Sequence, residues 1–408
     1  MHEDKAGELG MDRRGFGKVL LAGAASMGNT PADALPRVRS ASDTPYRVLP
    51  DLKVRRLGNI HTGGDYHTLV GKGPTEPASL DYFRRFNARY LTVRARTNAS
   101  AEEMRQWPHA GVFLNADGPW DGEELTRWQD NCRAADMVME AVRMDSAYII
   151  MKEGPQRERY LDLIRENIRK AGRAGVKLVS YHWTMIPIRR NFTAPGRGNS
   201  VYDGFKLEKD YRSLPVTEAA GRVSSDEYWE RIDHFLKGVV PVAREAKVKL
   251  AVHPYDPGGL PLGYQGVDNW DAVDYLGGIR KYLSLYDDPY NGLCYEVGVT
   301  GESIPDTNAQ LPFLREMSER GRIVQVHFRN IRGGQGNFVE VYEDEGDTDM
   351  LNCVRVLRDT GWEGTLLPDH NPSHADDPKK LQAFAFSYGY IEGLLRSARD
   401  EGLRATRA

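Results

Sequence analysis

Along most of the chain, short runs rich in apolar and β-branched residues alternate with longer segments in which apolar residues recur every three or four positions. The short runs are typical of buried strands, and the longer segments are typical of amphipathic helices. This alternation favours a parallel sheet whose strands are joined by helices. The runs that predict strands are Arg56–His61, Tyr90–Arg94, Ala147–Met151, Lys177–His182, Lys249–Pro254, Gly292–Val297, Ile323–Phe328 and Thr365–Asp369. Eight strands suit a closed α/β barrel, so we expect a (β/α)8 TIM barrel.

The first third of the chain is less clear, because Gly111–Asn115 is a ninth possible strand. Farther along, six segments show the spacing of amphipathic helices. These segments are Arg157–Ala174, Ser225–Ala246, Asn269–Tyr286, Asn308–Arg320, Asp349–Thr360 and Leu381–Arg396. The stretch Pro187–Val223 is rich in Arg, Asn, Gly and Pro, and it predicts a loop over the barrel mouth.

The composition is that of an ordinary globular protein. The 408 residues are 40% hydrophobic and 28% charged, with a formal net charge of -3. This balance gives no electrostatic reason to expect nucleic acid or an anionic membrane as a partner, so we expect a small molecule. The three cysteines, Cys132, Cys294 and Cys353, match neither a disulfide framework nor a zinc motif.

The N-terminal residues depart from this profile. Arg13 and Arg14 precede a weakly apolar run, Val19–Ala25, that is too short to span a bilayer. Ala32–Ala34 then offers a cleavage site of small residues, and the whole order resembles a twin-arginine export signal. We expect a signal over residues 1–34, a linker over 35–46 and one barrel domain over 47–408, with the mature enzyme periplasmic or secreted. A plain basic tail is the alternative.

Four polar residues end the last four predicted strands, each after an apolar run: His253, Glu296, His327 and Asp369. Strand C-termini ring one face of a barrel, so these side chains can converge although they are far apart in sequence. Two imidazoles and two carboxylates suit Mn²⁺, Fe²⁺ or Co²⁺ and leave positions open for substrate oxygens. Taken singly, a His or Asp at a strand end is more often a hydrogen-bonded core or loop residue than a ligand, and four in succession favour a joint site.

An ordered set of motifs in the second half resembles the mannonate dehydratases, which belong to the xylose-isomerase-like barrels. The motifs are His253–Pro257, Asn291–Leu293, Val326–Asn330, Gly346–Met350 and Pro368–His370. The resemblance covers roughly Gly154 to the C-terminus. It implies a xylose-isomerase-like fold and a metal-dependent hydro-lyase that converts D-mannonate to 2-keto-3-deoxy-D-gluconate and water.

Residue by residue, the resemblance places metal ligands at His253, His327 and Asp369. The family's fourth ligand is a cysteine, and Glu296 stands at its aligned position. Cys294 lies two residues earlier on the same strand face and is the alternative fourth donor. A carboxylate in place of a thiolate favours Mn²⁺, with Mg²⁺ as a further candidate.

The resemblance also suggests residues for the chemistry and for substrate. His370 is the candidate acid or base and Tyr388 a weaker one, since a family tyrosine in this region has no clean counterpart. Arg329 is a candidate carboxylate clamp, with Asn330 assisting by hydrogen bonds. The alternatives are an orienting hydrogen bond from His370 and a structural ion pair of Arg329.

Other changed or mouth-proximal residues are candidate substrate contacts. Asp256 lies in a motif that departs from the family, and Glu343 stands near where the family has a histidine. His182 and Trp183 follow the fourth predicted strand and could line the pocket, with core packing as the alternative. The run Arg189–Asn191 could bind an acidic substrate, or it could be a solvated loop.

Two rival functions share this frame. A sugar or sugar-acid isomerase or epimerase would also use a carboxylate-rich metal site, and it would release no water. A secreted sugar-acid-binding protein would bind metal and ligand without turnover. We also expect a homo-oligomer and no stable membrane insertion.

Overall fold

The computed structural model describes residues 60–68, 70, 73–95, 118–144, 147–183, 185–186 and 188–405. The predicted signal, linker and ninth strand lie outside these ranges, as do the first residues of the first predicted strand. Export of the chain therefore stays a prediction. Among the described residues, no helix is long and apolar enough to cross a membrane.

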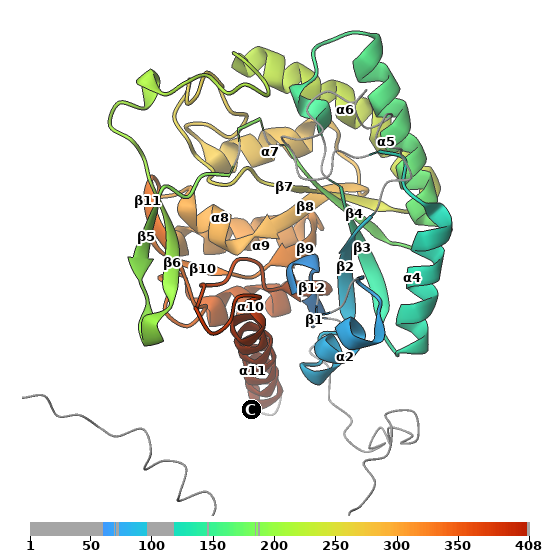
Figure 1. Cartoon of the computed structure of the whole chain (residues 1–408), viewed down its shortest axis with the longest axis vertical. Helices are drawn as coiled ribbons and strands as arrows, with labels where there is room; N and C mark the ends of the chain where they lie inside the picture. Colours follow the sequence, from blue (N-terminus) through green and yellow to red (C-terminus); the bar gives the residue numbers. More distant parts are fainter. Residues whose placement is uncertain are drawn as a thin grey trace, which may run out of the picture. The chain divides into compact units, whose positions relative to one another are not determined.

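Eight parallel strands close into a barrel in the order β1-β12-β9-β8-β7-β4-β3-β2 (Figure 1). The order means that chain neighbours are barrel neighbours, apart from the extra strands inserted elsewhere. The barrel strands are β1 (Ile60–Gly64), β2 (Tyr90–Arg94), β3 (Val138–Met144), β4 (Leu178–His182), β7 (Lys249–His253), β8 (Asn291–Glu296), β9 (Ile323–His327) and β12 (Gly364–Leu367). The predicted (β/α)8 fold class is confirmed.

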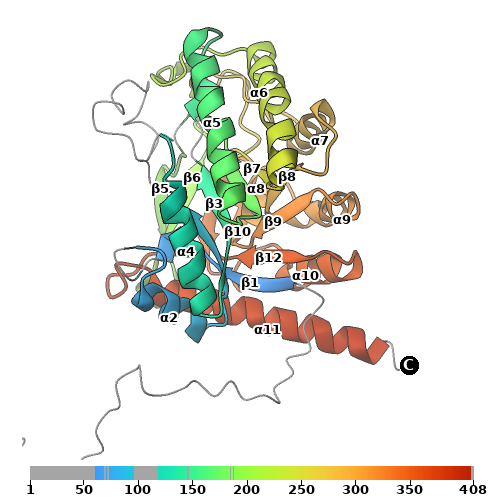
Figure 2. The ribbon, with the colours of Figure 1, turned by 90° about the vertical axis from the view of Figure 1, so that its right-hand side faces the viewer.

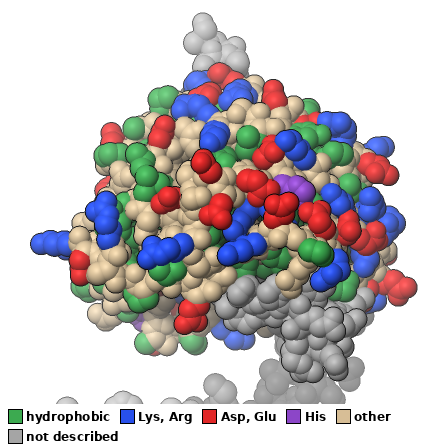
Figure 3. Space-filling view, turned by 90° about the horizontal axis from the view of Figure 1, so that it is seen from above, with side chains coloured by type: hydrophobic (Ala, Val, Ile, Leu, Met, Phe, Trp, Pro, Cys, Tyr) green, Lys and Arg blue, Asp and Glu red, His purple; other side chains and the backbone are tan. Residues whose placement is uncertain are grey.

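Helices surround this barrel, and α5 and α6 lie side by side along its outside (Figure 2). The α-helices are α2 (Pro77–Arg85), α4 (Gly122–Ala134), α5 (Pro155–Arg173), α6 (Ser225–Ala246), α7 (Tyr275–Leu285), α8 (Val297–Glu302), α9 (Leu311–Glu319), α10 (Met350–Asp359) and α11 (Leu381–Ala405). Helix α6 begins as its sequence predicts, because Ser224 and Glu227 form a reciprocal capping box. On the face drawn in Figure 3, acidic and basic side chains are intermingled rather than gathered into one basic patch.

One predicted strand is wrong. Residues Ala147–Ile150 form a 3-10 turn, and the strand that enters the barrel is β3, just before it. The turn is entirely buried and apolar, and a short apolar run of this kind does not distinguish a strand from a buried turn. The strand itself was hidden because it carries Glu140 and Arg143 among its apolar residues.

The stretch predicted as a loop, Pro187–Val223, contains two strands. They join two strands that follow β9 in a separate antiparallel sheet of order β10-β11-β6-β5, seen to the left in Figure 1. These strands are β5 (Phe192–Pro195), β6 (Val201–Lys206), β10 (Asn330–Gly334) and β11 (Asn337–Val341). Phe205 and Phe338 face each other in register with ring centroids 6.0 Å apart, and their packing fastens the two connections together.

The connection before α7 holds Val273 in a left-handed conformation at φ 72°, with 72% of its surface exposed. This conformation costs an L-residue about 1–2 kcal/mol and is least compatible with a β-branched side chain. Asparagine tolerates the left-handed region, so Val273→Asn is expected to raise the free energy of unfolding by about 1 kcal/mol. Chemical denaturation measures the change. The matched variant Val201→Asn, in an exposed position of β6, should lower stability instead; a gain in both variants would contradict the strain argument.

The same connection buries a carboxyl group. Asp271 is fully buried, its Oδ1 accepts a hydrogen bond from Asn269 Nδ2 at 2.7 Å, and its Oδ2 has no partner among the described residues. Burial raises the pKa of Asp271 to about 8. The native state therefore holds a proton that the unfolded chain releases near pH 4, and wild-type stability falls as pH rises between these two values.

Asp271→Asn removes this titration while keeping an acceptor for Asn269. The variant is expected to gain about 2–3 kcal/mol relative to the wild type between pH 5 and pH 7, from about 1.4 kcal/mol per pH unit. Denaturation curves at the two pH values give the difference. A gap that stays constant over this range would show that Asp271 is ionised in the native state.

Candidate metal centre and active-site cavity

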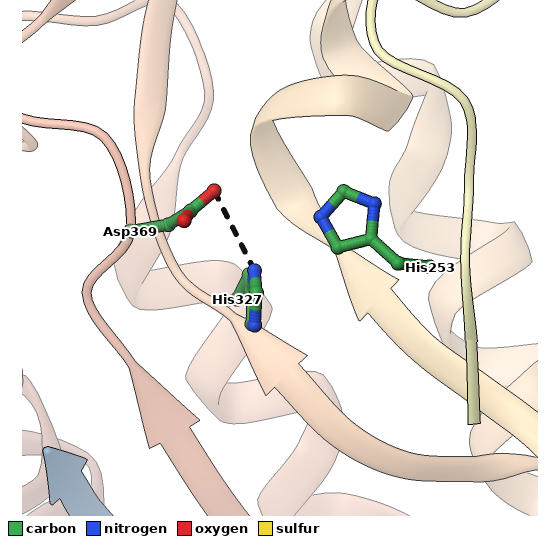
Figure 4. Close-up of side chains that lie close together, drawn as sticks. All are labelled: His253, His327 and Asp369. Atoms are coloured by element: carbon green, nitrogen blue, oxygen red, sulfur yellow. Dashed lines mark ion pairs between the residues drawn. The ribbon is translucent and has the colours of Figure 1, made fainter. Parts of the chain in front are cut away.

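Three polar side chains meet at the C-terminal ends of three barrel strands (Figure 4). His253 is the last residue of β7, His327 is the last residue of β9, and Asp369 follows β12. One ligand atom from each lies within 4.8 Å of the others, and all three residues are buried. His327 Nδ1 is 3.5 Å from Oδ2 of Asp369. The barrel has thus gathered three of the four predicted ligands into one cluster.

The chemistry of these donors fits a divalent cation. His253 Nδ1 donates to the carbonyl oxygen of Pro254 at 2.7 Å, which leaves Nε2 as the nitrogen with a free lone pair. Burial lowers the pKa of His253 well below its usual range, so the imidazole is neutral, as a metal ligand must be. His327 Nδ1 is buried and has no hydrogen-bond partner among the described residues. The same nitrogen lies 3.5 Å from Oδ2 of Asp369; burial lowers the pKa of His327, but Cys294 and Asp369 outweigh it and raise the pKa well above its usual range. A cation held here would therefore replace a proton on this ring.

Glu296 does not join this group of three. Its Oε2 caps α8 by accepting from the Val299 N–H at 2.9 Å and lies 3.1 Å from Arg329 Nη2. Its Oε1 is buried without a hydrogen-bond partner among the described residues. Burial raises the pKa of Glu296 to about 7 although Arg329 opposes the shift. Glu296 is both the last residue of β8 and the N-cap of α8, so one of its oxygens binds the backbone of the helix. The sequence prediction did not anticipate this second role.

Cys294, the alternative fourth donor, points into the barrel. It packs with small and aliphatic residues of neighbouring strands, Ala141, Leu178 and Ala251, and its Sγ lies 3.8 Å from Gln325 Oε1. Cys294 also interacts with the imidazole of His327, whose pKa it helps to raise, so it lies between the apolar interior of the barrel and the cluster.

Arg329 sits beneath this cluster as the centre of a buried ion-pair network. The side chain is 1% exposed, and its guanidinium lies 2.6 Å from Glu302, 3.1 Å from Glu296 and 3.4 Å from Asp256. The guanidinium nitrogens that were predicted to bind a substrate carboxylate are therefore occupied by carboxylates of the protein. In this structure the contacts of Arg329 are those of the structural ion pair named as the alternative.

His370 belongs to a second group of polar residues beside the first. Its Nδ1 is 2.5 Å from Oε1 of Glu340, and the same carboxylate oxygen lies 2.6 Å from Arg190 Nη2. Arg190 also contacts Asp256 at 2.8 Å. Burial lowers the pKa of His370, but the carboxylates of Asp369 and Glu340 outweigh it and raise the pKa to about 9. Glu340 comes from β11, so the separate sheet reaches the site through this residue.

Asp369 of the first group lines one cavity of about 550 Å³ together with His370, Glu340 and Arg190 of the second. Its walls include His67, Arg190, Glu340, Asp369, His370 and Lys379. A cavity of this size holds a small polar molecule, and its mixture of cations and carboxylates suits a hydroxylated acid. The cavity therefore borders one candidate metal ligand, Asp369, and the neighbouring imidazole of His370.

Two other predicted site residues are used by the fold. Asn330 donates to the carbonyl oxygens of Glu343 and Thr348 and accepts two backbone N–H groups, so it ties the β10–β11 hairpin to the following loop. Trp183 is 1% exposed and packs against Tyr282 and other rings. In this structure Asn330 and Trp183 make structural contacts within the protein, and neither lines the cavity.

Tyr388 is not brought to the cavity. It is 0% exposed, its hydroxyl bonds that of Thr68 at 3.0 Å, and its ring stacks on Phe86. It lies on the α11 face that packs on the barrel, where its apolar neighbours set its position. His182 is nearer, with its ring centroid 4.3 Å from that of His253, and it is half-buried.

Sequence reasoning missed two polar residues of the cavity. His67 lies in a 3-10 turn after β1, and Glu340 lies in a strand that was predicted as neither strand nor site. His67 could have been found from its place directly after a strand, since Asp65 and His67 follow the first barrel strand as Asp369 and His370 follow the last. Glu340 gave no such signal, because its strand is not part of the barrel.

Comparison with known proteins agrees with this architecture. The D-mannonate dehydratase (UxuA) family profile matches residues 199–405. A mannonate dehydratase of Thermotoga petrophila is 26% identical over 333 residues, covering 71% of this chain and 88% of the relative. A mannonate dehydratase of Streptococcus equi subsp. zooepidemicus is 26% identical over 339 residues, covering 74% and 90%.

Solved structures share the barrel. The crystal structure of mannonate dehydratase from Streptococcus suis serotype 2 superposes with a TM-score of 0.67 at 23% identity, covering 84% of this chain and 95% of that chain. A xylose isomerase domain protein from Planctomyces limnophilus gives 0.52 at 13% identity, covering 84% and 99%. At these identities the likeness establishes the xylose-isomerase-like fold. Because the family profile spans half of the sequence, including all three clustered donors, the chain belongs to the D-mannonate dehydratase family of hydro-lyases.

Proposed function

We propose that this protein removes water from a sugar acid, with D-mannonate as substrate and 2-keto-3-deoxy-D-gluconate as product. The observation that carries the proposal is the buried cluster of His253, His327 and Asp369, of which Asp369 also lines the cavity that contains His370. Membership of the hydro-lyase family supports the reaction class. The cavity volume and its charged walls support a small hydroxylated acid as the ligand.

We further propose that the cluster holds Mn²⁺ through His253, His327 and Asp369. When bound, a divalent cation supplies a Lewis acid that stabilises negative charge developing on a substrate carboxylate. The neutral imidazole of His253 is oriented for this task by its bond to Pro254. A mixed imidazole and carboxylate donor set suits Mn²⁺ better than a set of thiolates would.

The protein's own side chains handle protons in the cavity. Dehydration of an aldonate takes the proton from the carbon next to the carboxylate and gives a proton to the departing hydroxyl of the following carbon. His370 has both ring nitrogens near carboxylates, with Nδ1 2.5 Å from Glu340 and Nε2 3.7 Å from Asp369. This surrounding favours the doubly protonated ring, so His370 is the acid that protonates the departing hydroxyl.

The test is turnover by the full-length protein loaded with Mn²⁺. D-Mannonate and its epimers D-gluconate and D-altronate would be supplied separately, and formation of a 2-keto-3-deoxy acid would be followed. We expect product from D-mannonate, and we expect dialysis against a chelator to abolish it until Mn²⁺ is restored. Tightly bound Mn²⁺ with no dehydration product from any of the aldonates would overturn the proposal.

A further inference from the structure

A second histidine stands in the cavity, and the sequence analysis assigned it no role. His67 lies in the 3-10 turn Tyr66–Thr68 that directly follows β1. Strand β1 pairs with β12 in the closed barrel, so the two strands deliver His67 and His370 to neighbouring points of the same rim. Both imidazoles line the cavity, with ring centroids 6.4 Å apart and ring planes at 89°.

The fold orients His67 through a buried carboxylate. Its Nδ1 lies 2.5 Å from Oδ1 of Asp65, and the same oxygen accepts the backbone N–H of His67 at 2.9 Å. Asp65 is only 1% exposed, whereas the side chain of His67 is 35% exposed. A carboxylate on Nδ1 fixes the tautomer in which Nδ1 carries the hydrogen and Nε2 carries the lone pair.

The two histidines differ in what surrounds Nε2. For His370 this nitrogen lies 3.7 Å from a carboxylate oxygen of Asp369. For His67, no hydrogen bond or ion pair joins Nε2 to any residue in the described part of the chain. Because Asp65 holds Nδ1, Nε2 is the nitrogen of His67 that keeps a lone pair, and His67 lines the cavity. Both ring nitrogens of His370 instead face carboxylates, those of Glu340 and Asp369.

We propose that His67 is the base of the dehydration, taking the proton from the carbon next to the substrate carboxylate through Nε2. This inference rests on the proposed function. The electron pair of the broken C–H bond forms the new C=C bond, and the C–O bond of the adjacent hydroxyl breaks as His370 supplies the proton that makes it water. The resulting enol tautomerises to the 2-keto acid, and the proton held by His67 returns to solvent. Asp65 acts as a positioning residue.

Two observations favour this assignment. The reaction removes a proton at one carbon and delivers one at the next, and the cavity offers two imidazoles whose ring centroids are 6.4 Å apart. Tyr388, the other candidate for proton transfer, is a buried residue of α11 with its hydroxyl bonded to Thr68. Of the imidazoles lining the cavity, His67 is the one that remains.

The experiment compares His67→Gln with His370→Gln in the Mn²⁺-loaded full-length enzyme, using D-mannonate in D₂O. Loss of the base should lower kcat for dehydration by about 100-fold or more while KM changes little. It should also stop exchange of the C2 hydrogen of the remaining substrate for deuterium, followed by NMR. His370→Gln should lose dehydration but keep that exchange, because its base is intact.

The matched control is His234→Gln, since His234 is also 35% exposed and paired with a carboxylate, Glu158, but lies on α6 outside the cavity. Its kinetics should equal those of the wild type. In His67→Ala, added imidazole should restore part of the lost rate, which a merely structural role would not allow. Dehydration by His67→Gln at close to the wild-type rate, or C2 exchange that persists without His67, would overturn the assignment. Absence of turnover in the wild type would instead refute the proposed function, and the assignment with it.

Discussion

Replacing His327 with alanine is expected to abolish dehydration and to remove the bound metal together with it. Loss of a partner that merely orients a metal ligand typically costs about 10–100-fold, so loss of a ligand itself should exceed about 100-fold in kcat. His327 lies at the centre of the cluster, 5.0 Å from His253 between ring centroids and 3.5 Å from Asp369 between Nδ1 and Oδ2. Without it two donors remain, and they come from strands that are not adjacent in the barrel.

Metal content after dialysis, measured by atomic emission on the same sample as turnover, checks this expectation. His327 is only 2% exposed, so its replacement by alanine leaves a small buried cavity. Thermal unfolding of the variant should therefore be recorded, to separate loss of metal from loss of the fold. His234→Ala, remote from the cluster, is expected to keep both the metal and the activity. A folded His327→Ala protein that retains stoichiometric metal would show that the cation binds elsewhere.

Replacing Arg329 with methionine is expected to lower the free energy of unfolding by about 3–5 kcal/mol, because breaking a buried ion pair leaves its partner charges without compensation. Arg329 is 1% exposed, and Glu296, Glu302 and Asp256 surround its guanidinium. Methionine keeps an apolar chain of similar length, so the charge rather than the volume is removed. Chemical denaturation at neutral pH measures the loss.

The matched control is Arg280→Met. Arg280 also binds a carboxylate through two nitrogens, that of Glu316, but these side chains are 45% and 35% exposed. Exposed pairs contribute about 0–1 kcal/mol, so the control should lose little stability. Adding Glu302→Gln to Arg329→Met should recover part of the loss because one uncompensated charge disappears. Equal losses at Arg329 and Arg280 would show that the buried network does not carry the stability assigned to it.

The alternation of apolar runs and amphipathic segments was sufficient to predict the barrel, because each parallel strand is buried and each helix must present one apolar face. Seven of the eight predicted strands overlap strands of the barrel. The exception is Ala147–Met151, where a buried apolar run forms a turn, because burial alone does not distinguish a strand from a turn. The true strand, β3, was not predicted because Glu140 and Arg143 interrupt its apolar pattern. The antiparallel sheet escaped prediction because its central pairing, of β6 with β11, joins residues more than a hundred positions apart in the sequence.

The candidate site was predictable where strand ends determine position. His253, His327 and Asp369 converge because their strands do, and position along the chain implies this once a barrel is assumed. The ion pair between Arg329 and Glu296 could not be predicted, because it depends on side-chain directions that the spacing of residues does not determine. Glu340 was missed for the same reason, as it reaches His370 from outside the barrel.

The antiparallel sheet also bears on how this cavity could be altered. Strand β6 belongs to the connection after β4, whereas β11 belongs to the connection after β9, and the pairing of Gly204 with Val339 joins them beside Glu340. A change in the length or register of either connection would shift the Glu340 carboxylate and the imidazole that it holds. The connections after β4 and after β9 therefore form one structural unit. In a chimera with another barrel, both connections would have to be exchanged together to keep Glu340 and His370 in place.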